Sequence, residues 1–260
     1  MHCTFGNNII HDVNNKNVNE DIDPEKAIEI RAGIYWLGWP DEDAGFSNNP
    51  YLILDGEEAV LVDPGSRLDQ HWMWVKTKIE SIIPLDKITM IIVNHQDPDL
   101  VACIPLIEEI VGTESFEIVT TDRTSIFLPY YGIKTPVTTV EDGDILQVGS
   151  RQLMFITSPY LHFPGAMVFY DMKEKILFSS DIFGGFSVDW KLYADKYYME
   201  SIKLFSQPYF PAKRHVINFL DKIDKLDIDM ICPQHGSIIT RDLVDLAKDT
   251  LRNLEVGIWK

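Results

Sequence analysis

The chain has 260 residues and a formal net charge of −17, from 23 basic and 40 acidic side chains. Its length suits one large domain or two small ones, and a hydrophobic share of 45% with a charged share of 24% is ordinary for a soluble globular protein. The acidic balance excludes nucleic-acid binding, which requires clustered Lys and Arg, and it argues equally against an anionic membrane surface.

The three cysteines, Cys3, Cys103 and Cys232, form neither a CxxC pair nor an even-numbered disulfide framework. This pattern predicts free thiols in a reducing cytoplasm. The first residues lack the basic and apolar regions of a secretory signal, and no apolar run approaches the roughly 18 residues of a membrane span. We therefore expect a soluble cytoplasmic protein.

The first half of the chain is predicted to open with a polar lead-in over residues 1–26, which is rich in Asn and Asp. Strand-like alternation then begins at Ala27, and Gly56 marks a tight hairpin between two such runs. Further along, the pattern predicts a helix over 68–82, a buried strand over 89–94, an apolar stretch capped by Asp99 and interrupted by Pro105, a strand over 116–121, and a short helix ending near Tyr131.

The second half is predicted to hold four strands between about 144 and 181, helices over 190–206 and 211–225, a strand over 229–233 and a last helix from Arg241. The strands thus come in two batches, each followed by helices. This order predicts one mixed α/β domain, residues 27–260, with two sheets and helices outside them.

Side chains of the kinds that bind metals follow several predicted strands directly. They are His95, Asp97 and Asp99 after the strand IIVN, His162 after LMFIT, Asp181 after KILFS and His235 after DMIC. Loops at the carboxyl ends of strands in a layered sheet can converge on one site. We therefore expect these six side chains to meet.

Three imidazoles and three carboxylates are enough ligands for two metal ions that share a bridge. A thiolate-free, carboxylate-rich set suits iron or manganese better than structural zinc. Three Asp against two divalent ions leave the site near neutrality, so an anionic oxo, hydroxo or peroxo ligand can compensate further oxidation. Asp97 and Asp99 lie two positions apart on a loop, where they can face different ions.

Each of these residues also fits a plainer role when it is taken singly. His162 and His235 suit ordinary loop or core histidines, and Asp181 suits a turn before Ile-Phe-Gly-Gly. Asp99 suits a helix N-cap without any metal. Their joint occurrence after strand ends favours the metal site. The other histidines, His2, His11, His71 and His215, lie outside these loops and receive no role.

The chain resembles the metallo-β-lactamase fold and, within it, the di-iron domain of flavodiiron proteins. The resemblance rests on NPYLILDGEEAVLVDPGS, HQDPD, LFSSDIFGGF and PQHGSI, and covers most of the chain from about residue 28. It implies a four-layer αββα sandwich. The hydrolases of this superfamily carry HxHxDH and zinc, whereas the flavodiiron branch carries HxExDH and iron. Asp97 holds the place of that carboxylate, which favours iron.

Carried over by position, the resemblance implies that His95, Asp97 and His162 bind one iron and that Asp99 and His235 bind the other, with Asp181 as the bridge. The sequence departs from the family at Leu100, where the motif has its last histidine. The second iron therefore has one imidazole fewer, which leaves it weakly held, completed by water or another side chain, or open to a ligand such as O₂. Leu100 also fits a core contact at a helix start.

The resemblance further implies a protein that binds O₂ or NO as a sensor, like free-standing di-iron proteins of bacterial chemotaxis, or a slow oxygen reductase. Only 25 residues follow His235, too few for a flavodoxin domain, so we expect no FMN in this chain. A separate flavodoxin- or rubredoxin-like donor or a signalling protein is the expected partner, and the family implies a homodimer.

Two other functions remain open from the sequence. One is a dinuclear metallohydrolase acting on an ester, thioester or phosphodiester, with Asp99 orienting a bridging water. The other is a binding scaffold whose metal site has degenerated, a reading that Leu100 supports. Aromatic residues near the expected ligands are either core residues or hydrogen-bond donors to a bound ligand; they are Tyr160, Phe163, Phe183, Phe186 and, on a covering helix, Tyr197 and Tyr198.

Overall fold

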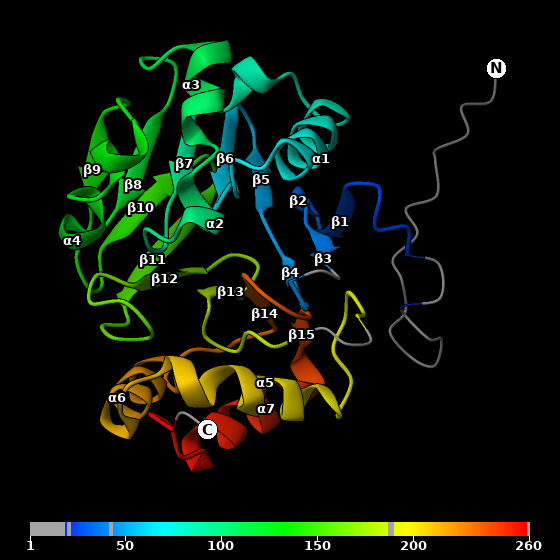
Figure 1. Ribbon diagram of the computed structural model, residues 1–260, viewed down its shortest axis with the longest axis vertical. Coiled ribbons are helices and arrows are strands. Elements are labelled where there is room, and N and C mark those ends of the chain that lie inside the picture. The colour runs from blue at the N-terminus through cyan, green and yellow to red at the C-terminus, as the bar shows by residue number, and fades with distance from the viewer. Residues whose placement is uncertain (1–18, 20–21, 42–43, 187–189, 259–260) are drawn as a thin grey trace.

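Two sheets stacked face to face form the centre of the computed structural model, which describes residues 19, 22–41, 44–186 and 190–258 (Figure 1). The first sheet has the order β1-β2-β5-β6-β7-β8-β9. Its strands are β1 (Ile28–Arg31), β2 (Ile34–Trp36), β5 (Tyr51–Asp55), β6 (Glu58–Val62), β7 (Met90–Ile92), β8 (Glu117–Thr120) and β9 (Val137–Thr139). Antiparallel pairing up to β6 gives way to parallel pairing from β6 to β9.

The second sheet has the order β10-β11-β12-β13-β14-β15. Its strands are β10 (Ile145–Val148), β11 (Arg151–Thr157), β12 (Met167–Asp171), β13 (Ile176–Ser180), β14 (Met230–Pro233) and β15 (Ile239–Thr240). All its pairs are antiparallel except β13 with β14. A separate hairpin joins β3 (Trp39–Asp41) to β4 (Phe46–Asn48).

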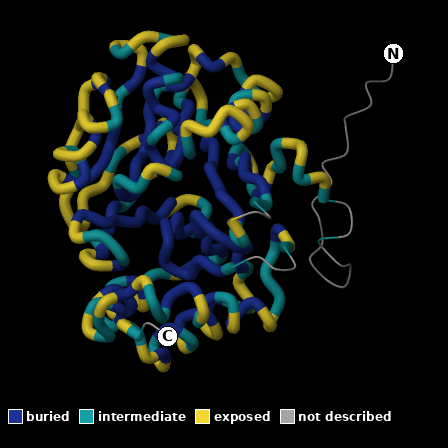
Figure 2. The backbone as a smooth tube through the Cα atoms, in the orientation of Figure 1, coloured by how far each residue is buried: buried dark blue, intermediate teal, exposed yellow. Residues whose placement is uncertain are grey.

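Helices cover the outer face of each sheet (Figure 1). Over the first sheet lie α1 (Asp69–Glu80), α2 (Pro98–Val101), α3 (Ile104–Val111) and α4 (Asp122–Ser125), with the short 3-10 turns η1 (Leu85–Lys87) and η2 (Leu128–Tyr131). Under the second lie α5 (Tyr198–Tyr209), α6 (Lys213–Ile223) and α7 (Arg241–Asn253). Apolar clusters fill all three interfaces, one between the sheets and one between each sheet and its helices. Figure 2 shows that the sheet strands are largely buried and that exposed residues lie mostly on the outside.

The predicted α/β architecture of two sheets with helices outside is confirmed, as is the single-domain αββα sandwich. The hairpin at Gly56 is also confirmed, since Asp55 pairs with Glu58 and Gly56 has a φ of 67°. The last helix begins at Arg241 as expected. Most of the lead-in over residues 1–26, with Cys3, His2 and His11, lies outside the described residues.

Two local predictions are wrong, and two elements were not predicted. The helix expected from 190 begins only at Tyr198, because Tyr193 is held in extended backbone by a parallel bridge to Ile238 and by the side chain of Asn19. The sequence reading also missed β9 and the β3–β4 hairpin. Asp99 is not the helix cap: Asp97 occupies that position, and Asp99 lies in the first turn of α2.

None of the helices in the described parts of the chain combines the length and the apolar content needed to cross a bilayer.

Candidate metal centre

The six predicted ligands lie on four loops that meet where the two sheets face each other. His95, Asp97 and Asp99 follow β7 of the first sheet. His162, Asp181 and His235 follow β11, β13 and β14 of the second sheet. The structure therefore brings all six together from segments up to 140 residues apart in sequence.

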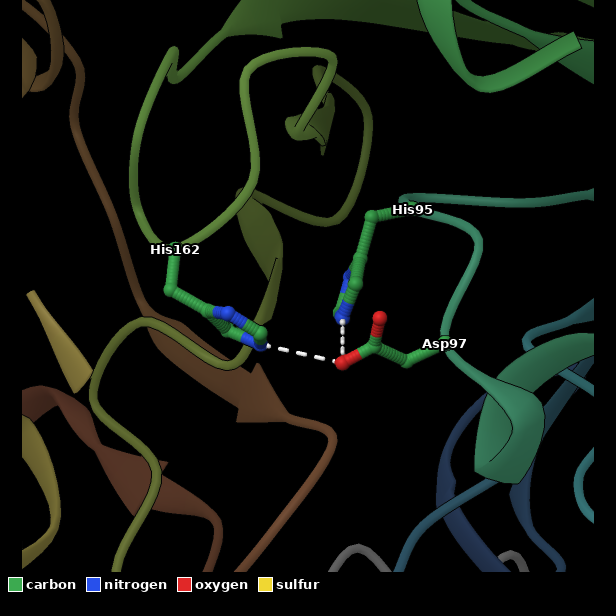
Figure 3. Close-up of side chains that lie close together, drawn as sticks. All are labelled: His95, Asp97 and His162. Carbon is green, nitrogen blue, oxygen red and sulfur yellow. Dashed lines mark ion pairs between the residues drawn. The ribbon is translucent and has the colours of Figure 1, made fainter. Parts of the chain in front are cut away.

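The first cluster consists of His95, Asp97 and His162, whose ligand atoms all lie within 4.8 Å of one another. Figure 3 shows both imidazoles pointing at the Asp97 carboxylate, His162 from the opposite loop. The Asp97 Oδ2 atom is 3.2 Å from His162 Nε2 and 3.6 Å from His95 Nε2. Two imidazoles and a carboxylate converging in this way form a metal-ligand set of the kind that binds iron or zinc.

The second cluster pairs Asp99 with His235, whose Nε2 atom lies 3.2 Å from Asp99 Oδ2. Asp97 and Asp99 thus face different imidazoles although they are two positions apart. The side chains of Asp99 and Asp97 are 29% and 31% exposed, whereas His235 is buried at 6%. Solvent and small ligands therefore reach the centre from the carboxylate side.

Asp181 lies between the two clusters and carries one oxygen atom into each. Its Oδ2 atom is 2.9 Å from His162 Nε2 and 3.6 Å from His95 Nε2, while Oδ1 is 3.7 Å from His235 Nε2. Asp181 Oδ1 and His95 Nε2 are both buried without a hydrogen-bond partner. Buried polar atoms left unpaired are costly, and here they point into a set of hard ligands. The residues therefore fit two bridged metal ions.

Contacts with the histidines of the centre lower the pKa of two of its carboxyl groups, Asp181 and Asp97. Burial alone would raise the pKa of Asp181, but the charges of His95, His162 and His235 outweigh burial and lower it to about 2. Burial of Asp97 is likewise outweighed by hydrogen bonds from His162 and His95, so its pKa lies well below the usual range. These groups are ionised at neutral pH and ready to bind cations.

Two of the imidazoles have their outer nitrogen fixed by a neighbour. His235 Nδ1 donates to the carbonyl of Ser47 at 2.8 Å, which directs Nε2 toward Asp99. His95 Nδ1 lies 2.9 Å from Ser180 Oγ. Such outer contacts orient metal-binding histidines. The sequence reading missed both serines, because nothing in their own sequence context links them to a histidine 85 or 188 residues away.

The loop that carries His235 has a second support in Asn49, which is fully buried. Its amide nitrogen donates to the carbonyls of Pro233 and Gly236, both at 3.0 Å, and its backbone N–H donates to Gln234. Ser47 Oγ also exchanges hydrogen bonds with Gly236 in both directions. The segment 47–49 therefore serves as a cradle for the His235 loop.

Left-handed backbone also concentrates at the centre. Of the five described non-glycine residues with positive φ, Ser180 and Phe183 flank Asp181, Tyr160 precedes His162, and Asp63 bonds to the residue before His95. Such conformations cost of order 1–3 kcal/mol each and gather at functional sites. The strain at Ser180 and Phe183 places Asp181 in a tight turn between the clusters.

The aromatic residues around the centre include Phe183 and Tyr198, which were expected there and are both buried. Tyr197 is 72% exposed. Tyr198 is buried, and its hydroxyl donates to the carbonyls of Phe183 at 3.0 Å and His235 at 3.3 Å, so it supports the ligand loops. Tyr209 covers His162 at a ring-centroid distance of 5.5 Å and stacks on Phe205 at 4.8 Å.

Two tyrosines that were not predicted from the sequence, Tyr209 and Tyr131, have their pKa raised by burial and by the charges of the centre. Burial and then the negative charges of Asp181, Asp99 and Asp97 raise the pKa of Tyr209. Burial and the charges of Asp97 and Asp99 raise the pKa of Tyr131. Both phenols therefore keep their protons at neutral pH and can donate a hydrogen bond. In the sequence, Tyr209 could have been found only from its spacing of 11 positions from Tyr198, which places both residues on one face of a helix.

Leu100 is fully buried in the apolar cluster between the first sheet and its helices. The same cluster also contains Leu37, Trp39 and Ile104. The core role that the sequence allowed for Leu100 is thus what the structure shows. The second cluster accordingly has Asp99, His235 and a share of Asp181, one side chain fewer than the first.

Metal binding at this centre is expected to release protons. Burial lowers the pKa of His162 and His235, but contacts with Asp181, Asp97 and Asp99 outweigh it and raise their pKa values to about 10 and about 9. Both imidazoles are therefore protonated at pH 7 and must lose a proton before they bind a metal. We expect at least two protons per chain in a pH-stat titration of the apoprotein with ferrous iron at pH 7.

The same shifts fix the sign of two pH dependences. Stability that these raised pKa values give the apoprotein is complete below pH 6.5 and is lost as the pH rises through about 9 to 10. Metal affinity should rise over this same interval. An apoprotein whose unfolding midpoint climbs between pH 7 and pH 10, or a titration that releases fewer than one proton, would contradict the assignment.

Comparison with known proteins adds a family to this geometry. A family model described as ODP family beta lactamase matches residues 46–236. An uncharacterized protein of Methanocaldococcus jannaschii is 33% identical over 82% of this chain and 56% of its own length. The flavo-diiron protein FprA2 of Clostridium acetobutylicum is 30% identical over 82% of this chain and 55% of its own length.

Among solved structures, one described as the peroxy diiron species of the chemotaxis sensor ODP has a TM-score of 0.75 and 27% identity, covering 89% of this chain and 96% of that chain. By contrast, the chain spans about half the length of the curated relatives it matches. These matches confirm the resemblance to the flavodiiron branch that the motifs indicated.

Proposed function

Since the chain belongs to the ODP family of beta-lactamase-type proteins, we propose that it holds two iron ions and binds dioxygen, or nitric oxide, as a sensor or slow reductase. The observation that carries this proposal is the position of Asp181, with one oxygen atom facing each cluster. His95, Asp97 and His162 hold the first iron, Asp99 and His235 hold the second, and Asp181 joins them.

The donor set favours iron over structural zinc. Three imidazoles and three carboxylates meet without a thiolate, and such a set suits iron. Burial raises the pKa of the Cys103 and Cys232 thiols, and both are buried free cysteines. Relatives described as flavo-diiron protein and as a peroxy diiron species support iron at the level of the family. Iron bound here supplies the electrons that dioxygen takes up.

The walls of the centre suit a small ligand. On one side, the rings of Phe46 and Phe205 pack on His235, at 4.6 Å and 5.5 Å. On the open side, Asp97 and Asp99 are about one-third exposed. Because Leu100 belongs to the core and not to the second cluster, a diatomic molecule can take the ligand position beside Asp99 that no side chain fills. The hydroxyl of Tyr209 orients such a ligand by donating a hydrogen bond to it.

The same proposal includes the setting of the protein. We assign it to the cytoplasm, because the described cysteines are free thiols. A separate protein receives the signal or, for reductase activity, a flavodoxin- or rubredoxin-like protein delivers electrons, and the chain acts as a homodimer. Sedimentation of the purified protein tests the dimer.

An optical titration of anaerobically reconstituted protein tests the function. We expect two irons per chain and a stable charge-transfer band when oxygen is admitted. Tyr209→Phe should keep both irons but lose the band about tenfold faster, since one charge-assisted hydrogen bond is worth about 1.5–3 kcal/mol. Tyr197→Phe, which removes an exposed hydroxyl, is the matched control and should change neither. Stoichiometric zinc with ester hydrolysis, or a spectrum that ignores oxygen, would overturn the proposal in favour of a hydrolase or scaffold.

A further inference from the structure

The hairpin of β3 and β4 connects the second cluster to His71 on α1, a residue that has no role in the proposed function. Asp41 pairs with Phe46 and Pro40 pairs with Ser47 across the hairpin. Phe46 packs edge-on against the His235 ring, and the Ser47 carbonyl accepts the His235 Nδ1 proton. A shift of Asp41 at the end of β3 would therefore move Phe46 and Ser47, the two residues that contact His235, through the backbone pairing of the hairpin.

A histidine on α1 holds Asp41 from the other side. His71 Nε2 lies 3.4 Å from Asp41 Oδ2, and His71 Nδ1 lies 2.8 Å from Ser66 Oγ. The side chains of His71 and Asp41 are 14% and 15% exposed, so the contact is largely shielded from water. The Trp39 ring lies 4.7 Å from that of His71, and Trp74 stacks on His71 at 6.1 Å with an interplanar angle of 10°.

Ser66 belongs to the loop that fixes the opposite side of the second cluster. The preceding residue, Gly65, donates its N–H to the carbonyl of Leu100 at 3.1 Å and accepts the N–H of Cys103 at 3.1 Å. These bonds attach the loop to α2, the helix that carries Asp99. Gly65 has a φ of 113°, and a Cβ there would lie 3.6 Å from Trp39 and 3.9 Å from the Asp99 carbonyl.

His71 thus bridges two elements, one that positions His235 and one that positions Asp99. We propose that the group Asp41–His71–Ser66, which we call the His71 clamp, sets the separation of Asp99 and His235 and thereby the hold on the second iron. His71 acts through other residues and is a positioning residue. This inference rests on the proposed di-iron function, and it adds the determinant that compensates the second cluster for its smaller ligand set.

Ring chemistry explains why histidine suits this place. An imidazole presents two nitrogen atoms on opposite sides of a rigid ring, one for the Ser66 hydroxyl and one for the Asp41 carboxylate. Its ring packs against both Trp39 and Trp74, which also contact each other at a ring-centroid distance of 5.7 Å. Glutamine offers an acceptor and a donor on one flexible chain, so His71→Gln should keep both polar contacts, whereas His71→Ala removes both.

Two measurements on the full chain test the clamp. In the apoprotein, hydrogen exchange at the Gly236 amide reports the cradle directly, because that N–H donates to Ser47 Oγ at 2.8 Å. In protein loaded anaerobically with ferrous iron, a chelator challenge reports how tightly each iron is held. Outer contacts of this kind change metal affinity about 10–100-fold, so His71→Ala should speed loss of one iron about tenfold, keep the other, and raise Gly236 exchange.

His71→Gln should restore the rate of iron loss and the rate of Gly236 exchange to within about threefold of the wild type. Ser66→Ala, which removes the bond to His71 and a longer bond from the Leu68 N–H, should give an intermediate effect. Lys76→Ala on the same helix, where Lys76 pairs with Glu80, is the matched control and should behave as the wild type. The inference is overturned if His71→Ala loses both irons equally or leaves the Gly236 amide unchanged, or if the glutamine variant fails to rescue. If no variant binds iron while Gly236 exchange still follows this order, the di-iron function fails and the clamp stands.

Discussion

Replacing Asp181 with alanine is expected to abolish retention of both metal ions. Asp181 gives one oxygen atom to each cluster, so the substitution removes a ligand from both at once. Loss of an outer contact already costs about 10–100-fold in metal affinity, and loss of a shared ligand should cost more at each ion. Iron analysis after anaerobic loading and gel filtration should fall from two ions per chain to none.

The same substitution leaves three buried or half-buried imidazoles without their common carboxylate. Removing one partner of a buried ion pair costs about 3–5 kcal/mol, so lower stability must be separated from lost metal. Asp171→Ala provides the matched control, because Asp171 is equally buried and binds Arg151 at 2.7 Å away from the centre. That variant should lose comparable stability and keep two irons. Full iron content in Asp181→Ala would refute the bridge.

Restoring the family's histidine at position 100 is expected to destabilise the protein. Leu100 is fully buried among Leu37, Trp39 and Ile104, and a polar group in such a site costs about 2–5 kcal/mol when it finds no partner. Leu100→His should therefore lower the free energy of unfolding by about 3 kcal/mol in denaturant titrations. Iron should recover little of this loss.

Ile107→His is the control for that experiment, because Ile107 is just as buried in the same apolar cluster but belongs to α3. The two variants should be destabilised alike, with and without iron. A Leu100→His protein that iron restores to wild-type stability, with a slower chelator release of the second iron, would show instead that the new imidazole reaches the centre.

The sequence predicted the layers and the six clustered side chains because both are local signals. Alternating apolar residues specify strands wherever one face is buried. A His or Asp directly after such a strand indicates a potential metal ligand on the loop at the sheet edge. The confirmed elements, such as β11 and α7, are those with clear periodicity. The assignment of the six residues to metals remains a prediction.

The errors arose where distant contacts override local preference. Residues 190–197 read as helix, yet Tyr193 takes its partners from Ile238 and Asn19. The β3–β4 hairpin contains Pro40 and has strands too short to show an alternating pattern. Its contacts are with His71 and with the His235 loop, which only the folded chain brings near. The same reason hid Ser47 and Asn49 from the sequence reading.

The division of ligands between the two sheets has a mechanical consequence. Each proposed iron takes ligands from both halves of the sandwich, Asp97 or Asp99 after β7 on one side and His162 or His235 on the other. Ions bound in this way would join the two sheets, because separating the sheets would require metal–ligand bonds to break. Iron loading should therefore slow global unfolding, in which the sheets separate, more than it slows local opening within either sheet. A change in ligand geometry at the metals would therefore tend to shift one sheet relative to the other.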